Sequence, residues 1–202
     1  PFVTWVAGQG ARLRRLTLRD TVIIGVTGSC GKTTTTALIG QVLSTKAKCQ
    51  VKAGGNTYKA ATRTMLALTG SDPFSIHEVG AFEPGSVARA ARILRPHIGV
   101  VTVIGTDHYR QFRSLAAIAE EKSALVAVLP RSGTAILNAD DPHVRAMASK
   151  TQARVVSYGL SADADVRGSE VSADWPNRLS FTVTYRCEQA HVQTQFVGDQ
   201  WV

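Results

Sequence analysis

The chain has 202 residues, of which 44% are hydrophobic and 19% charged, a composition that fits one medium-sized globular domain and excludes a disordered or collagen-like chain. Its formal net charge is +8 at pH 7, and the excess is concentrated in residues 1–150, which hold 19 basic and 9 acidic side chains. No apolar run reaches the roughly 18 residues that span a bilayer, so no membrane span is expected.

The basic excess predicts an anionic partner. Nucleic acid is one such partner, but only 6% of the residues are aromatic and no basic run is longer than RLRR at 12–15, so a phosphorylated small molecule is favoured and no nucleic-acid partner is expected. The three cysteines, Cys30, Cys49 and Cys187, are widely spaced and form no C-x-x-C pair. This pattern favours a reducing compartment such as the cytoplasm.

From residue 21 to about 150, two hydrophobic periodicities alternate along the chain. β-branched apolar runs of strand length break into turns, and stretches of helix length follow the turns. The predicted segments are strands at 21–26, 74–81, 97–105 and 133–141, and helices at 33–46, 86–95, 114–129 and 142–150. Strands alternating with helices predict an α/β fold, a doubly wound and mostly parallel sheet with helices on both faces.

Capping signals mark two of these helices. Ser114 is the expected N-cap of the helix at 114–129. Pro142 suits the first turn of the helix at 142–150, and Asp140 and Asp141 are expected to cap it.

From about residue 154, the pattern changes to short alternating stretches at 153–159, 178–186 and 191–198. These are interpreted as antiparallel edge strands, so about 154–200 is predicted to be a small antiparallel β extension of a domain at 21–202. Residues 1–20 are interpreted as a linker or the remnant of a preceding domain. Because the chain lacks an initiator Met and ends at VGDQWV without a cap or turn, the natural protein is expected to continue.

The strongest functional signal is GVTGSCGKTT at residues 25–34, where the first strand gives way to a helix. Backbone N–H groups and the helix N-terminus present positive charge to phosphate, Lys32 adds a full charge, and the Thr33 hydroxyl suits Mg²⁺. The common P-loop has Gly where this chain has Val26. The alternative is a glycine turn with a surface lysine. The predicted nucleotide contacts here are Gly28, Ser29, Cys30, Gly31, Lys32, Thr33 and Thr34.

This loop resembles the ATP-binding loop of the Mur ligases, a family of ATP-dependent amide-forming enzymes. The likeness continues through AGGNT at 53–57, HEVGAFEPG and the sequence after it at 77–125, and AILNADDP at 135–142, in the order and spacing of that family's central domain. It covers roughly residues 21–200. The motifs are most similar to those of members that add a dipeptide to a UDP-muramoyl peptide.

The resemblance implies two Mg²⁺ ions. Glu78 ends an apolar strand, where ligands gather in doubly wound sheets, and it matches the family's metal-binding Glu. His108 matches the ligand of a second ion. Val103 stands where the family carries Asn, and Asp107 is a candidate replacement for that Asn. The implied catalytic residues are Lys32, Glu78, His108 and Lys122, and the implied metal ligands are Thr33, Glu78, His108 and Lys122.

Lys122 also stands out by its position in the helix at 114–129. It falls on the apolar stripe that includes Leu115, Ile118 and Leu125, so it is predicted to face the interior. Burial lowers the pKa of a lysine toward a neutral amine, which can take up CO₂ as a carbamate. The lysine at the matching position is carbamylated in several Mur-type ligases. The alternative is a lysine that snorkels at the sheet edge.

Two asparagines complete the implied site. Asn138 matches the family's Asn that reads adenine. Gly55 and Asn56 resemble a loop near the metal and the peptide substrate, although the residues after them lack the family's Asn pair and following Gly.

The resemblance implies an ATP-dependent ligase that joins a carboxylate substrate, possibly UDP-linked, to an amino acid or dipeptide through an acyl phosphate. Full activity would need an N-terminal substrate domain and a C-terminal domain, neither recognisable in this chain. The alternatives are a ligase of the cyanophycin, polyglutamate or folylpolyglutamate type, a P-loop switch or kinase, for which no N-K-x-D motif is found, and a non-catalytic nucleotide-binding module.

Overall fold

The computed structural model describes residues 2–54, 57–107 and 109–199, and within them the strands form one sheet in the order β2-β3-β1-β4-β5-β6-β7-β8-β9. Pairing is parallel from β2 through β6. The strand bounds are β1 Val22–Thr27, β2 Cys49–Lys52, β3 Phe74–Glu78, β4 Ile98–Val101, β5 Thr134–Asn138, β6 Arg154–Gly159, β7 Val166–Ser172, β8 Ser180–Tyr185 and β9 Glu188–Gln193.

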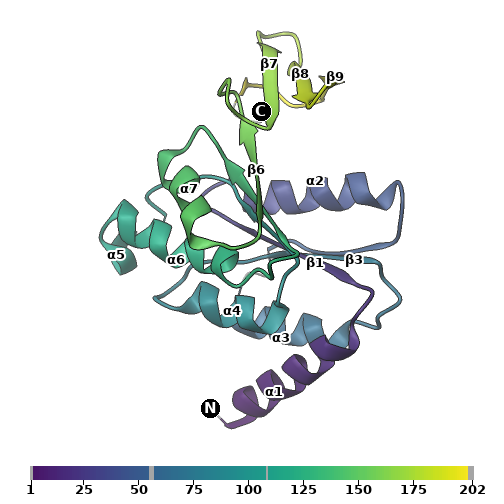
Figure 1. Cartoon of the computed structure of the whole chain (residues 1–202), viewed down its shortest axis with the longest axis vertical. Helices are drawn as coiled ribbons and strands as arrows, with labels where there is room; N and C mark the ends of the chain where they lie inside the picture. Colours follow the sequence, from purple (N-terminus) through teal and green to yellow (C-terminus); the bar gives the residue numbers. More distant parts are fainter. Residues whose placement is uncertain (1, 55–56, 108, 200–202) are drawn as a thin grey trace.

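Helices cover both faces of the parallel part of the sheet (Figure 1), so the predicted doubly wound architecture is confirmed. Helix α2 lies on one face, whereas α3, α4 and α6 lie on the other. The helix bounds are α1 Phe2–Thr17, α2 Lys32–Ser44, α3 Tyr58–Ala67, α4 Ser86–Leu94, α5 Tyr109–Phe112, α6 Leu115–Ala127 and α7 Pro142–Arg145, followed by the 3-10 helix η1 Ala146–Lys150.

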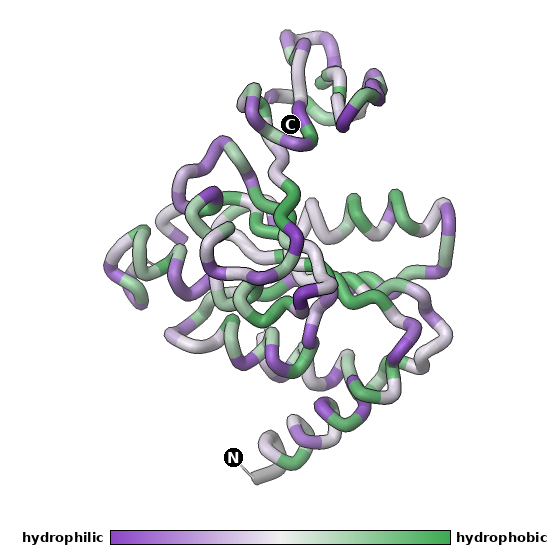
Figure 2. The backbone as a smooth tube through the Cα atoms, in the orientation of Figure 1, coloured by the Kyte–Doolittle hydropathy of each residue, from purple (hydrophilic) through white to green (hydrophobic). Residues whose placement is uncertain are grey.

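Alternate side chains of the central strands supply apolar cores on both faces of the sheet. Ile24 and Val26 of β1 and Ile76 of β3 pack under α2 with Ile39 and Leu43. Ile23 of β1 points to the other face and joins the buried side chains of α3 and α4. Hydrophobic positions accordingly gather in the central strands (Figure 2), the pattern expected of a sheet covered on both sides.

Helix α1 occupies residues that the sequence analysis interpreted as a linker or a domain remnant. It packs against α3 and α4, and two arginines anchor it. The Nε atom of Arg14 donates to the Leu68 carbonyl at 3.0 Å, and that of Arg15 donates to the Leu94 carbonyl at 2.9 Å. These bonds satisfy carbonyls at the C-terminal ends of α3 and α4. Whether the segment belongs to a preceding domain stays a prediction.

One part of the C-terminal prediction is wrong. Strand β6 was expected to be antiparallel, but it pairs in parallel with β5, from Thr134↔Arg154 to Asn138↔Tyr158. It is half-exposed and therefore lacks the continuous apolar run of a buried parallel strand. The antiparallel extension instead consists of β7, β8 and β9, which project from the body (Figure 1).

The capping predictions are partly confirmed. Ser114 caps α6, and Asp141 caps α7 by accepting from the backbone N–H groups of His143 and Val144. Asp140 does not cap the helix, because its carboxylate accepts from the N–H groups of Leu160 and Ser161 after β6. The predicted helix at 142–150 is a short α-helix that tightens into the 3-10 helix η1.

Among the helices that the structure describes, none combines the length and apolar character needed to cross a membrane. Cys30, Cys49 and Cys187 are free thiols.

Candidate functional site

The candidate site lies at the carboxyl end of β1, which pairs with β3 on one side and with β4 on the other. The chain leaves β1 through residues 28–31 and enters α2 at Lys32. In an open parallel sheet, a strand whose neighbours connect in opposite directions opens a crevice at its carboxyl end. Gly28 directly follows β1, Glu78 is the last residue of β3, and Asp107 lies in the segment after β4.

Two glycines give the phosphate loop its shape. Gly28 has φ +148° and Gly31 has φ +81°, backbone conformations that residues other than glycine rarely adopt. A Cβ atom on Gly28 would also collide with the Thr102 hydroxyl. Ser29 ties the loop to the chain after β4, because its N–H donates to the Val103 carbonyl at 2.7 Å and its hydroxyl accepts from the Gly105 N–H at 2.8 Å.

Thr102 holds the loop from the neighbouring strand, and the sequence analysis missed this role. Its hydroxyl lies 2.6 Å from the Cys30 carbonyl, to which it donates, and 3.3 Å from the Thr27 carbonyl. The available signal was a hydroxyl residue directly after the apolar run of β4. Cys30 itself is exposed, so its thiol is not packed inside the loop.

Lys32 folds back over the loop. Its Nζ atom donates to the carbonyls of Gly28 at 2.8 Å and Ser29 at 3.1 Å, and it lies 4.0 Å from the Oδ2 atom of Asp107. The ammonium group therefore lies against the loop, next to the backbone N–H groups at the start of α2, which carry partial positive charge. Cation and helix N-terminus together make this loop suited to an anion.

Glu78 meets the start of α2 from the adjacent strand. Its Oε2 atom accepts from the Thr33 hydroxyl at 2.8 Å and from the Gly54 N–H at 2.7 Å. The structure thus brings together two predicted metal ligands, Thr33 and Glu78, from elements that are 45 residues apart in the sequence. Thr34, in the same turn of α2, is half-buried.

Lys122 is fully buried, so the prediction that it faces the interior is confirmed and the snorkelling alternative is wrong. Its Nζ atom donates to the Gly28 carbonyl at 2.9 Å and to the Oδ2 atom of Asp107 at 3.2 Å. Burial lowers the pKa of Lys122, while the charge and hydrogen bond of Asp107 oppose that effect. One buried amine is thereby shared between the phosphate loop and a carboxylate.

The oxygen atoms of this site suit Mg²⁺. Within the described residues, no group of three or more His, Cys, Asp and Glu side chains could hold a metal ion by itself. Mg²⁺ is commonly held by one or two carboxylates together with phosphate oxygens, which fits the pair of Thr33 and Glu78 beside an anion loop. Asp107 adds a second carboxylate, whose Oδ1 atom is buried and has no hydrogen-bond partner among the residues that the structure describes.

Asn138 ends β5, two strands from β1 in the sheet. Its Oδ1 atom accepts from the Asp140 N–H at 2.8 Å, which fixes the carbonyl side of the amide and directs the NH₂ group elsewhere. A cavity of about 420 Å³ adjoins it. Its lining residues are Ala139, Asp140, Pro142, Arg145, Ala146 and Ser161.

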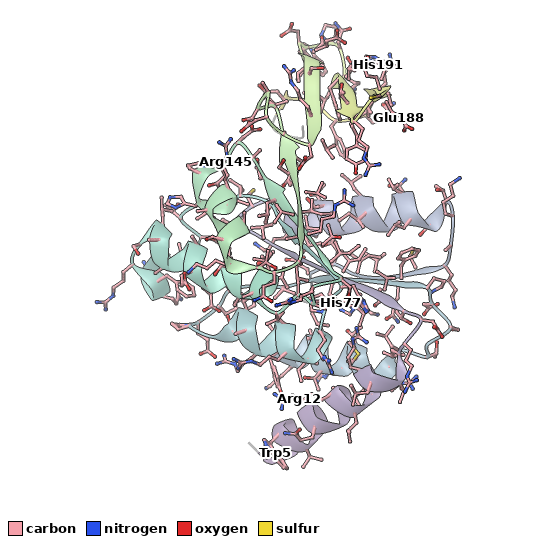
Figure 3. The ribbon with its side chains drawn as sticks, viewed as in Figure 1. Trp5, Arg12, His77, Arg145, Glu188 and His191 are labelled. Carbon is pink, nitrogen blue, oxygen red and sulfur yellow. The ribbon has the colours of Figure 1, made fainter. Side chains whose placement is uncertain are left out.

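A larger cavity of about 710 Å³ lies where the N-terminal ends of α1, α3 and α4 meet. Trp5 and Arg145, one from each cavity, are well separated in Figure 3. The larger cavity combines three aromatic rings with two cations, Lys59 and Arg89, and one carboxylate, Glu83, which pairs with Arg89. Its lining residues are Trp5, Thr57, Tyr58, Lys59, Phe82, Glu83, Ser86 and Arg89.

Three predicted residues, Gly55, Asn56 and His108, lie outside the described residues. Val103 is half-buried, and its carbonyl accepts from Ser29. Asp107, the candidate replacement for the family's Asn, contacts Lys122. Whether Asp107 takes over the role of that Asn stays a prediction.

The sequence profile of the Mur ligase middle domain matches residues 26–202. A UDP-N-acetylmuramoyl-tripeptide–D-alanyl-D-alanine ligase of Mycobacterium tuberculosis is 39% identical over 181 residues, which cover 89% of this chain and 36% of that protein. A ligase of the same name from Synechocystis is 40% identical over 149 residues, 73% of this chain and 33% of that protein. The chain thus spans about a third of the length of these curated relatives.

Solved structures show the same fold. MurF from Acinetobacter baumannii superposes with a TM-score of 0.90 at 24% identity, over 97% of this chain and 43% of that chain. MurF ligase from Thermotoga maritima, in complex with ADP, superposes with a TM-score of 0.83 at 20% identity, over 94% of this chain and 44% of that chain. Sequence profile, relatives and fold agree, and the chain belongs to the Mur ligase family.

Proposed function

We propose that this domain binds Mg-ATP and is the nucleotide-binding part of an ATP-dependent ligase that joins a carboxylate substrate to an amino acid or dipeptide. The observation that carries the proposal is the phosphate loop, in which Lys32, the Thr33–Glu78 pair and the buried amine of Lys122 converge on one crevice. The names of the relatives support an amide-forming ligase. A cytoplasmic location, where ATP is available, follows from the same proposal.

In the proposed reaction, the γ-phosphoryl group of ATP passes to the substrate carboxylate and ADP leaves. The incoming amine then attacks the carbonyl carbon of the acyl phosphate, and phosphate departs as the amide forms. No nucleophile from the protein is needed. The work of the domain is to hold the phosphates and offset the negative charge that develops during transfer. The ammonium group of Lys32 and the N–H groups at the start of α2 are placed for that task.

We assign Thr33 and Glu78 to one Mg²⁺ ion, and His108 with Lys122 to a second. Bound Mg²⁺ would supply positive charge to the phosphate oxygens. A carbamate on Lys122 would convert its cationic head into an anionic ligand. The Asp107 carboxylate already lies next to the Lys122 amine. If Lys122 is not carbamylated, Asp107 is the anionic group at this position.

Two further contacts complete the proposal. The amide NH₂ of Asn138 is assigned to adenine, which is supported by the fixed orientation of its carbonyl. The larger cavity is assigned to the carboxylate substrate, because Lys59 adds a positive charge beside the Arg89–Glu83 ion pair, which suits an anionic, UDP-linked molecule, and because Asn56 directly precedes the lining residue Thr57. The N-terminal and C-terminal domains of a longer protein would complete both sites.

The test is ADP release by the full-length protein with Mg-ATP and a UDP-muramoyl tripeptide, with and without D-alanyl-D-alanine. We expect release that continues over many turnovers only when both substrates are present. Release with a folate or a polyglutamate as the carboxylate substrate and glutamate as the amine would instead identify another Mur-type ligase. ATP binding without any acceptor-dependent release would indicate a nucleotide-binding module.

A further inference from the structure

Helix α6 contacts two parts of the site through consecutive residues. Lys122 reaches the phosphate loop after β1, as described above. Glu121, the residue before it, points toward α4. Its Oε2 atom accepts from the Gly85 N–H at 2.7 Å, and its Oε1 atom accepts from the Val87 N–H at 2.8 Å and from the Ser86 hydroxyl at 3.2 Å.

These bonds replace a cap that α4 does not supply for itself. Gly85, the N-cap residue, has no side chain to accept from the first N–H groups of the helix. A carboxylate at a helix N-terminus also interacts favourably with the helix dipole. Glu121 therefore supplies from another helix the negative charge and the acceptors that this end of α4 requires.

The contact extends into the turn that precedes α4. Ser86 is buried, and its hydroxyl donates to Glu121 while it accepts from the Phe82 N–H at 3.1 Å. Phe82, Glu83 and Ser86 form one wall of the larger cavity. Through the Ser86 hydroxyl, the Glu121 carboxylate thus holds the turn that begins at Phe82, four residues after Glu78.

We propose that Glu121 is a positioning residue that holds the turn at 82–87 in place, so that the wall of the substrate cavity keeps a set position relative to the phosphate loop. The inference rests on the proposed function, since it takes the larger cavity as the site of the carboxylate substrate. Helix α6 then joins the two substrate sites as a rigid connection, with Lys122 at one and Glu121 at the other.

Glu121→Gln is the direct test, because the amide keeps the size of the side chain but has one acceptor atom in place of two. Its NH₂ group would face a backbone N–H of α4. The matched control is Glu120→Gln on the same helix, where the exposed carboxylate pairs with Lys150. Ser86→Ala removes only the hydroxyl that links Glu121 to Phe82.

The first measurement is amide hydrogen exchange, which does not depend on activity. In the full-length protein, we expect exchange at 82–87 to be at least about tenfold faster in Glu121→Gln and unchanged in Glu120→Gln, with the loop at 27–33 as protected as in the wild type. Unchanged exchange at 82–87 in Glu121→Gln would overturn the proposal, whether or not the protein is a ligase.

The second measurement separates the two substrates. We expect the KM for the carboxylate substrate to rise about tenfold in Glu121→Gln and in Ser86→Ala, with less than additive effects in the double variant and an unchanged KM for Mg-ATP. Parallel changes in both KM values would show a general loss of structure and would contradict a positioning role. If the wild type releases no ADP with any acceptor, the proposed function fails and the exchange measurement alone decides.

Discussion

The Nζ atom of Lys122 lies 3.2 Å from the Oδ2 atom of Asp107, and the lysine side chain has no exposed surface. Burial favours a neutral amine, whereas the carboxylate favours an ammonium group. The two effects act on the same atom, which also donates to the Gly28 carbonyl. The charge of this lysine is therefore linked to the phosphate loop and to whatever binds there.

The first prediction concerns that lysine. If Lys122 carries a carbamate when Mg-ATP is bound, ¹³C-bicarbonate labelling will give a carbamate signal in the wild type and none in Lys122→Ala. Lys122→Glu should keep some activity, and Lys122→Ala should lose it and recover partly with a short-chain carboxylate but not with chloride. Lys150→Ala, which changes an exposed lysine, is the control. Normal turnover in Lys122→Ala without a carbamate signal would exclude the role.

Lys32→Ala should reduce Mg-ATP affinity by at least about a hundredfold while the thermal transition stays unchanged, because the ammonium group bonds to loop carbonyls and contributes nothing to the apolar core. Calorimetric titration measures the affinity. Lys46→Ala, an exposed lysine just after α2, is the matched control. Wild-type affinity in Lys32→Ala would contradict the assignment of the loop.

Glu78→Gln should lower Mg²⁺-dependent turnover more than nucleotide binding, since a metal ion chiefly serves the transferring phosphoryl group. An amide oxygen can still accept from Thr33 and Gly54, so the local structure should persist. We expect a loss of about a hundredfold in kcat and less than tenfold in affinity. Glu188→Gln on β9 controls for charge, and equal losses in kcat and affinity would indicate a structural role instead.

Asp141→Ala should destabilise the fold by about 2 kcal/mol, because it leaves three buried or half-buried donors without their acceptor. The carboxylate accepts from the N–H groups of His143 and Val144 and, at 2.6 Å, from that of Ile104 after β4. Urea unfolding of the variant beside exposed Asp174→Ala measures the difference. Equal stability of the two variants would show that water replaces the carboxylate.

His77 makes stability depend on pH. Its side chain lies inside the body (Figure 3), and burial, with a smaller effect of the Lys52 charge, lowers its pKa from 6.5 to about 4. The contribution of the neutral ring to the free energy of unfolding is therefore fully present above pH 6.5 and is lost as the pH falls toward 4. Over that window, we expect the wild type to lose roughly 3 kcal/mol more than His77→Gln.

Urea unfolding at several pH values checks this difference. Exposed His191→Gln should follow the wild type. A His77→Gln variant with the same pH slope as the wild type would show that the ring is not held neutral in the fold.

Local pattern was enough for much of the fold. The strands and helices at 21–46 and 74–150, the cap at Ser114 and the loop at 25–34 were predicted, because hydrophobic periodicity and turn chemistry act between residues close in sequence. Strand β2 and helix α3, which lie between these two stretches, were not predicted. The burial of Lys122 was predicted for the same reason, since its spacing from Ile118 and Leu125 decides its face of the helix.

The parallel pairing of β6 could not be predicted in this way. Its half-exposed side chains do not distinguish a parallel strand from an antiparallel edge strand, and only its partner β5 decides the direction. Similarly, Gly8 and Gly10 weaken the helical pattern of α1, which is held by the bonds of Arg14 and Arg15 to distant carbonyls.

The sequence by itself determined where the glycine loop between β1 and α2 lies and which side of α6 is buried, because those properties are set within one loop and one helix. Only the tertiary structure decided which distant residues form hydrogen bonds with one another. Thr102 bonds to Cys30 across 72 residues, Glu121 to Gly85 across 36, and Lys122 to Gly28 across 94. Glu120 and Glu121 are identical in type and adjacent, and only the packing of α6 against α4 makes one an exposed charge and the other a helix cap.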